Sequence, residues 1–201
     1  MANKDKVIDL VFDIANKLRG PYRPPQYRKV MLPMTVLRRL DLVLQPTKDE
    51  VRAEYGRLQA QGLEGAALHS ILARKAAKGR QHPLYNISPF TFETLLGDPP
   101  NIATNLTSFI GGFSENVRRI FERFEFELEI EKLDKSNRLF LIIKEFTDPQ
   151  IKLHPDDLDN ADMGDVFEEL VRRFNEQANE EAGDHFTPRE VIHLMANLIY
   201  T

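Results

Sequence analysis

Apolar side chains recur every three or four residues along almost the whole chain, and this period constrains the fold more than any other feature. The first stripe is Val7, Val11, Ile14 and Leu18, with spacings of 4, 3 and 4. Such spacing places apolar side chains on one face of an α-helix. Only residues 126–130, FELEI, alternate as a short strand would, and five residues without a partner run are weak evidence. The pattern predicts an all-α fold.

Prolines and glycines divide this pattern into separate helices. We expect Gly20-Pro21 to end the first helix, and Gln45-Pro46 to end a second helix that is kinked at Pro33. The reason is that an internal proline lacks the N–H needed by the helix and its ring clashes with the preceding turn. Further breaks are expected at Asp98-Pro99-Pro100, at Gly111-Gly112 and at Asp148-Pro149.

Several polar residues are placed to cap helices. Thr47 and Glu50 fit a capping box at the start of a third helix, and Gly62 is placed to close it. Ser114 and Asp162 are expected N-caps of later helices. The helix after Asp162 carries a strong apolar stripe, and we expect it to give way to an acidic stretch over 175–185, NEQANEEAGDH.

A last helix start follows that stretch, where Thr187, Pro188 and Glu190 supply an N-cap, a proline at the first helical position and a capping-box acid. A helix start presents free backbone N–H groups and positive potential, which stabilise a carboxylate or a phosphate. On the pattern alone, a capped helix that binds nothing is the commoner explanation.

Composition excludes several function classes. The 201 residues suffice for one domain or two small ones, and the absence of cysteine excludes disulfides, thiolate metal sites and cysteine nucleophiles. There is no GxGxxG motif and no phosphate-binding loop. His154 with Asp156 and Asp157 is more typical of a turn than of a metal site, so no metal is expected. No apolar run approaches the ~20 residues of a membrane span, and no signal peptide is present, which favours the cytoplasm.

The charge balance argues against a general attraction to nucleic acid, since 27 Lys and Arg residues face 31 Asp and Glu residues, for a net charge of -4. Local basic faces remain possible, although a solvated helix surface is the commoner explanation of such clusters. The candidate phosphate contacts are Arg38, Arg39, Arg74, Lys75, Lys78 and Arg80.

A family resemblance adds to this reading. Residues 163–199, MGDVFEELVRRFNEQANEEAGDHFTPREVIHLMANLI, resemble the modification subunits of type I restriction-modification systems. The likeness continues in residues 16–41, 84–96 and 153–160, and so covers in effect the whole chain. It implies an adenine-specific DNA methyltransferase that uses S-adenosylmethionine, with a helical N-terminal domain ahead of a Rossmann-like catalytic domain. Residues 1–160 would form the helical DNA-interaction and assembly domain, and 161–201 the connection into the catalytic domain.

The resemblance also supplies a ligand for the last helix start. In such methyltransferases an aromatic-Thr-Pro element just before the sheet contributes to the S-adenosylmethionine pocket. Free amides near Thr187 would then hold the methionine carboxylate while Phe186 packs against the cofactor. The candidate cofactor residues are Asp184, His185, Phe186, Thr187, Pro188 and Arg189.

Two family motifs do not occur in this sequence, namely the glycine-bearing cofactor motif and the Asn-Pro-Pro-aromatic motif that grips the adenine amine. An adenine flipped out of the duplex needs that pocket, so we expect this chain not to methylate DNA by itself. The implied partners are double-stranded DNA, the specificity subunit, the restriction subunit and a second modification subunit. The alternative is a non-enzymatic helical adaptor or regulator, in which the FTPR segment would be only a helix cap.

Overall fold

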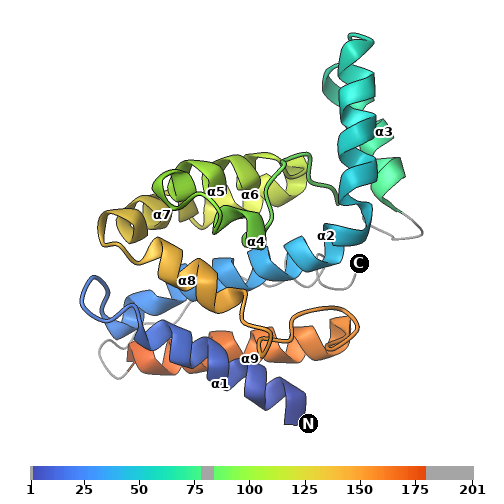
Figure 1. The fold of residues 1–201 in the computed structure, drawn as a ribbon. Helices are drawn as coiled ribbons and strands as arrows, with labels where there is room; N and C mark the ends of the chain where they lie inside the picture. Colours follow the sequence, from blue (N-terminus) through green and yellow to red (C-terminus); the bar gives the residue numbers. More distant parts are fainter. Residues whose placement is uncertain (1, 78–83, 180–201) are drawn as a thin grey trace.

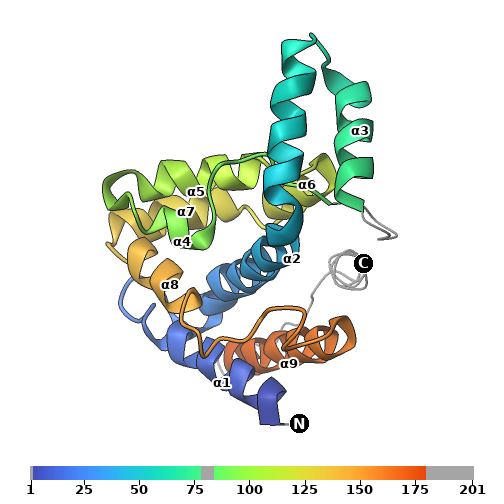
Figure 2. The ribbon, with the colours of Figure 1, turned by 45° about the vertical axis from the view of Figure 1, so that its right-hand side comes forward.

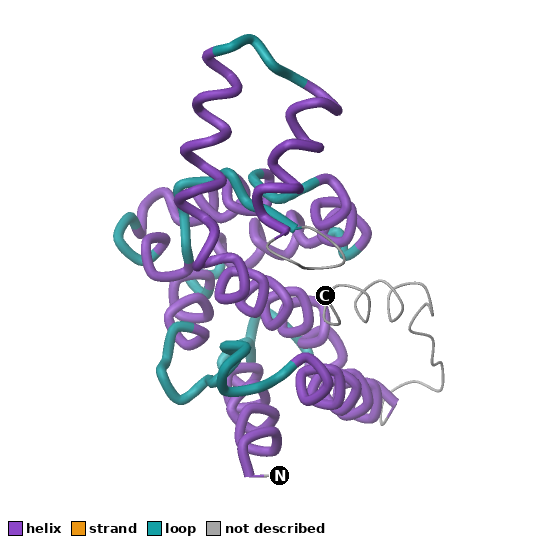
Figure 3. Tube along the Cα trace, turned by 90° about the vertical axis from the view of Figure 1, so that its right-hand side faces the viewer, coloured by secondary structure: helices purple, strands orange, loops and turns teal. Residues whose placement is uncertain are grey.

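The computed structural model describes residues 2–77 and 84–179. Within these ranges the chain forms nine α-helices and two short 3-10 helices and has no β-strand, so the all-α prediction is confirmed (Figure 3). The alternating residues 126–130 belong to a helix. In chain order the α-helices are α1 (Ala2–Asn16), α2 (Tyr27–Ala60), α3 (Gly65–Ala77), α4 (Phe92–Leu95), α5 (Ile102–Gly111), α6 (Glu115–Arg123), α7 (Phe126–Lys135), α8 (Leu139–Phe146) and α9 (Asn160–Asn179).

The first half of α2 runs through the middle of the body, and the other helices pack around it (Figure 1). Helices α1 and α9 lie side by side on one flank, while α5 to α8 cover the other. The interior between them is apolar and rich in aromatic rings. Five phenylalanine side chains are fully buried, Phe92, Phe109, Phe126, Phe146 and Phe174.

The second half of α2 leaves the body and pairs with α3 in a projecting helical hairpin, residues 47–77, which we call the arm (Figures 1 and 2). A separate small cluster of buried side chains holds its two helices together, including Val51, Leu58 and Leu72. Gly62 adopts a φ of +73°, just after α2 ends. Glycine takes this left-handed conformation at little cost, so the predicted helix end at Gly62 is confirmed.

The predicted break at Gln45-Pro46 is wrong, and so is the capping box of Thr47 and Glu50, because α2 continues through all of these residues. Pro46 instead lies between two halves of α2 that run in different directions (Figures 1 and 2), as expected where a proline kinks a helix. The Thr47 hydroxyl donates to the Leu44 carbonyl at 3.1 Å. Residues on both sides of Pro46 are buried, so tertiary packing stabilises the helix where the local sequence favours a stop.

Two predicted caps also differ from the structure. Ser114 occupies the N-cap position of α6 but makes no cap hydrogen bond, and its buried Oγ has no partner in the described part of the chain. At the start of α9 the carboxylate of Asp159, and not that of Asp162, accepts the cap hydrogen bond, from the Asp162 N–H at 2.8 Å. Helix α9 also extends to Asn179, beyond its predicted end, and an exposed ion pair between Arg172 and Glu176 joins two of its last turns.

Other boundaries agree with the sequence. Helix α4 ends before the predicted break at Asp98-Pro99-Pro100, α5 ends at Gly111-Gly112, and α8 ends before Asp148-Pro149. None of the helices in the described ranges is both long and apolar enough to cross a membrane. The division of the chain at residue 160 stays a prediction. In the structure, α9 packs directly on α1 and α2.

Candidate nucleic-acid interface

The arm carries two of the predicted phosphate contacts. Arg74 and Lys75 lie in the last turn of α3, and both side chains are exposed. Their positive charges complement the negative end of the helix dipole. The pKa of the Glu54 carboxyl is lowered, mainly by its hydrogen bonds with Arg57 and to a smaller degree by the charge of Lys75. Lys78 and Arg80, which follow in the sequence, lie outside the described residues.

Arg38 is buried at the base of the arm. Its guanidinium group pairs with Asp41 at 3.2 Å and with Glu93 at 2.8 Å, and it lies over the Phe92 ring. These partners come from α2 itself and from α4. Arg38 therefore joins α4 to the helix that carries the arm.

Arg39 is also buried, but it points to a different part of the body, because consecutive residues lie about 100° apart around a helix. Its Nη1 donates to the carbonyls of Leu153 and Leu158 at 2.7 and 2.8 Å, and its Nη2 donates to Asn160 Oδ1 at 2.9 Å. Burial lowers the pKa of Arg39, against the opposing charge of Asp159. Arg39 thus fixes the segment that leads into α9.

The structure does not gather the described basic candidates on one surface. Arg38 and Arg39 hold intramolecular partners inside the body, whereas Arg74 and Lys75 face solvent on the arm. Phosphate contact by Arg38 or Arg39 stays a prediction that would require those partners to be exchanged. Sequence reasoning also left out Arg119 of α6, an exposed basic residue on a helix whose N-terminal end borders α3.

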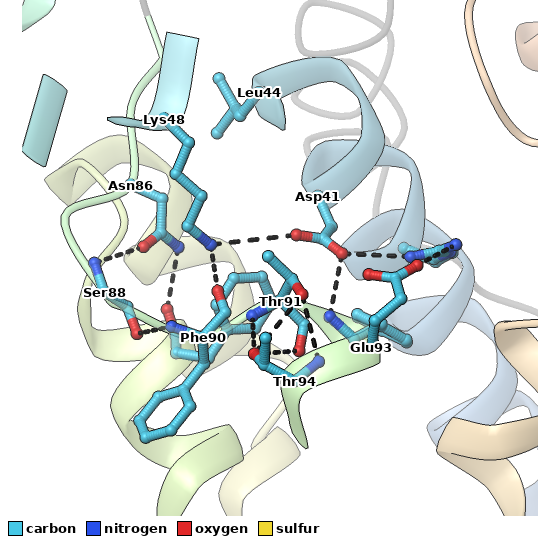
Figure 4. A network of polar contacts seen from close by, with 12 residues as sticks. Asp41, Leu44, Lys48, Asn86, Ser88, Phe90, Thr91, Glu93 and Thr94 are labelled. Atoms are coloured by element: carbon cyan, nitrogen blue, oxygen red, sulfur yellow. Dashed lines mark hydrogen bonds and ion pairs between the residues drawn. The ribbon is translucent and has the colours of Figure 1, made fainter. Parts of the chain in front are cut away.

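A buried polar network spans the bend of α2 (Figure 4). Asp41 Oδ2 accepts the backbone N–H of Phe92 at 3.0 Å, and Asp41 Oδ1 lies 4.0 Å from Lys48 Nζ. Lys48 in turn donates to the carbonyl of Phe90. Burial raises the pKa of Asp41 and lowers the pKa of Lys48, because each charge has lost water. Since Asp41 and Lys48 lie on opposite sides of Pro46, the network fixes the bend.

The segment that returns from the arm is fixed as well. Asn86 donates to the Phe109 carbonyl at 3.0 Å and accepts the N–H of Ser88 at 2.7 Å (Figure 4). The backbone of Ile87 donates to the Gly112 carbonyl at 2.8 Å. Gly112 has room only for a hydrogen, since an added Cβ would lie 2.6 Å from the Ser88 Cβ. Both ends of the arm are therefore attached to the body by buried hydrogen bonds.

Sequence reasoning missed this network. The available signal was Asp41, a charged residue beside the apolar stripe of the second predicted helix; Lys48 fell in the predicted third helix and gave no such signal. Buried charges need partners, and the partners here are the backbone groups of Phe90 and Phe92, 42 and 51 positions further along the chain.

The candidate cofactor residues Asp184, His185, Phe186, Thr187, Pro188 and Arg189 lie outside the described residues. In the ranges that are described, no group of three or more His, Asp or Glu side chains is arranged to hold a metal ion. His154 accepts the N–H of Asp156 at 3.2 Å, within a local turn.

Comparison with known families finds two matches, one after the other along this chain. The model described as the HsdM N-terminal domain matches residues 9–146, more than half of the sequence. The model described as N-6 DNA methylase matches residues 158–201, which include α9 and the candidate cofactor residues. No curated protein matches the chain.

Proposed function

For this chain, which belongs to the HsdM N-terminal domain family, we propose that its helices position double-stranded DNA and assemble the subunit with its partners. The chain carries the N-terminal part of a type I modification subunit, which is an adenine methyltransferase. The non-enzymatic adaptor is not favoured, because a methylase match over residues 158–201 follows the match to the helical domain. The partners that we propose are the specificity subunit, the restriction subunit and a second modification subunit.

The observation that carries the DNA proposal is the exposed basic end of α3 on a projecting arm. Arg74 and Lys75 are not enclosed by the body, so a phosphate backbone can approach them. The other two arginines of the described arm already have carboxylate neighbours, since Arg57 pairs with Glu54 at 2.6 Å and Arg52 lies 4.0 Å from Asp49. Lys75 interacts with the Glu54 carboxylate through its charge. The buried network at the base of the arm would hold Arg74 and Lys75 in a defined position.

The test compares two double variants of the full-length subunit assembled with its specificity subunit. We expect Arg74→Gln with Lys75→Gln to weaken DNA binding equally on all sequences and to reduce the slope of log K against log salt by about 1 to 2. The matched control is Arg52→Gln with Arg57→Gln, which should leave the slope unchanged. Equal slopes in both double variants would refute the assignment to the end of α3.

The 201-residue chain alone should bind DNA weakly and without sequence preference. Its net charge is -4, and in the proposed complex the specificity subunit reads the sequence. Footprinting of the chain on defined duplexes at physiological salt would test this. A protected sequence would contradict the proposal.

We further propose that residues 184–189 form one edge of the S-adenosylmethionine site in the full-length subunit. Support comes from the family's aromatic-Thr-Pro element and from the N-6 DNA methylase match, which covers these residues. Phe186 would pack on the cofactor and Thr187 would cap a helix beside its carboxylate. A single edge does not enclose a ligand, so the 201-residue chain should bind the cofactor poorly and should not methylate DNA.

Calorimetry separates the possible roles of this motif. In the full-length subunit, Thr187→Ala should remove a helix cap, at about 0.5 to 2 kcal/mol, and should also weaken cofactor binding. Phe186→Ala should act mainly on cofactor affinity. Unchanged cofactor affinity in both variants, or tight cofactor binding by the 201-residue chain, would mean that the motif is only a helix cap.

We also propose that the full-length subunit acts in the cytoplasm, where the DNA is.

A further inference from the structure

A groove of about 500 Å³ lies between α5, α6 and α7, and we call it the α5–α7 groove. Its apolar lining includes Phe121 and Ile130, which are buried core residues, and Ile110, which is half-buried. These side chains belong to the main core, so the groove exposes part of the interior of the body. Neither the proposed DNA contact on the arm nor the proposed cofactor site includes a residue that lines this groove.

Leu128 stands at the edge of the groove and is 61% exposed. On α7 the side chains of Phe126, Ile130 and Leu133 are buried. Leu128 is two residues from Phe126 and two from Ile130, so it lies on the opposite side of the helix. A single exposed leucine is ordinary on a protein surface. This one differs because it lines the groove and also a second hollow of about 470 Å³ beside Pro21. Leu128 and Glu131 line both hollows, and the rest of the second hollow is mostly polar, with Lys132, Lys135 and Ser136 beside Pro21.

The charges around the groove are mostly negative. Four glutamates line it, Glu122, Glu125, Glu127 and Glu131, against one cation, Arg118. Glu131 pairs with Lys135 at 3.2 Å. Among the described residues, the other three form no ion pair. A groove with an apolar floor and this rim attracts cationic groups and repels phosphate.

We propose that the α5–α7 groove docks an amphipathic segment of a different protein chain of the type I complex, with an apolar side chain against Leu128 and Lys or Arg side chains against the three unpaired glutamates. The proposal rests on the assembly role proposed above. DNA is disfavoured because its phosphates carry the same charge as the rim. A two-fold contact with a second copy is disfavoured because it would bring the two acidic rims together.

The first test places a photo-reactive amino acid, p-benzoylphenylalanine, at position 128 of the full-length subunit within the assembled complex. The matched control carries it at Phe140, the other exposed large hydrophobic residue in the described ranges, which is 39% exposed and does not line the groove. We expect position 128 to cross-link to a segment of a different subunit that has an apolar residue flanked by Lys or Arg. A cross-link to DNA, to a second copy or to an acidic segment would overturn the proposal, as would a yield no higher than that at 140.

The second test measures assembly directly. Leu128→Asp should weaken association of the full-length subunit with that partner by about tenfold or more, as expected for the central residue of an interface, and Phe140→Asp should change it by less than about twofold. Replacing Glu122, Glu125 and Glu127 together by Gln should reduce the salt dependence of association. Equal effects at 128 and 140 would overturn the proposal. If Leu128→Asp assembles normally while DNA binding still depends on Arg74 and Lys75, this inference fails and the proposed function stands.

Discussion

Arg39 offers the sharpest test of how this fold is held together, because three hydrogen bonds from one buried guanidinium group join α2 to the segment before α9 and to its first residue, Asn160. Arg39→Met keeps most of the apolar stem but leaves the carbonyls of Leu153 and Leu158 without a donor. A buried polar group without its partner costs about 1 to 3 kcal/mol, so two such groups cost about 2 to 6 kcal/mol. For a chain of this size each kcal/mol lowers Tm by about 2 to 4 °C, and we expect a drop of at least about 4 °C.

The measurement is thermal and urea unfolding of the 201-residue chain, followed by circular dichroism. Arg52→Met is the matched control, because its side chain is partly exposed and lies 4.0 Å from Asp49 on the surface. It should change stability by less than about 0.5 kcal/mol. If Arg39→Met were as stable as this control, the hydrogen bonds of Arg39 would contribute nothing to the fold. Lower DNA affinity at unchanged Tm would instead favour the phosphate contact expected from the sequence.

Two further predictions use neighbouring or paired residues. Gly112→Ala should destabilise the chain by about 1 to 3 kcal/mol in urea unfolding, because the added Cβ would meet Ser88 and Asn86. Gly111→Ala has open space around the added Cβ and should be neutral or slightly stabilising. Equal stabilities of the two variants would contradict the close contact of Gly112 with Ser88. Hydrogen bonds from Arg172, the larger cause, and from Arg173 lower the pKa of the Glu169 carboxyl to about 2. The ionised carboxylate therefore stabilises the fold above its unfolded pKa of about 4.3, and this contribution is lost as pH falls through about 2. An NMR titration of Glu169 should show that midpoint, and replacement of both arginines by Gln should return it to the ordinary range; an unchanged midpoint in the double variant would reject the cause.

The sequence alone predicted the fold class, most helix boundaries and the family. These follow from local patterns, since the helical period and the Gly and Pro breaks involve residues within one or two turns of each other. The family resemblance was confirmed by two matches, over residues 9–146 and 158–201. Of the phosphate candidates within the described residues, Arg74 and Lys75 lie exposed in the last turn of α3, and their contact with phosphate stays a prediction.

Tertiary structure decided what local patterns leave open. Pro46 is a stop signal in the sequence, yet α2 continues through it because residues on both sides pack in the interior and a buried network spans the bend. Arg39 looks in the sequence like Arg74, but its partners are carbonyls 114 and 119 residues away. Leu128 lies in the one segment whose alternation resembles a strand, and only the packing of α5, α6 and α7 shows it exposed on a helix beside an acidic groove. Burial and partner choice depend on contacts between distant segments, and a local pattern contains no information about them.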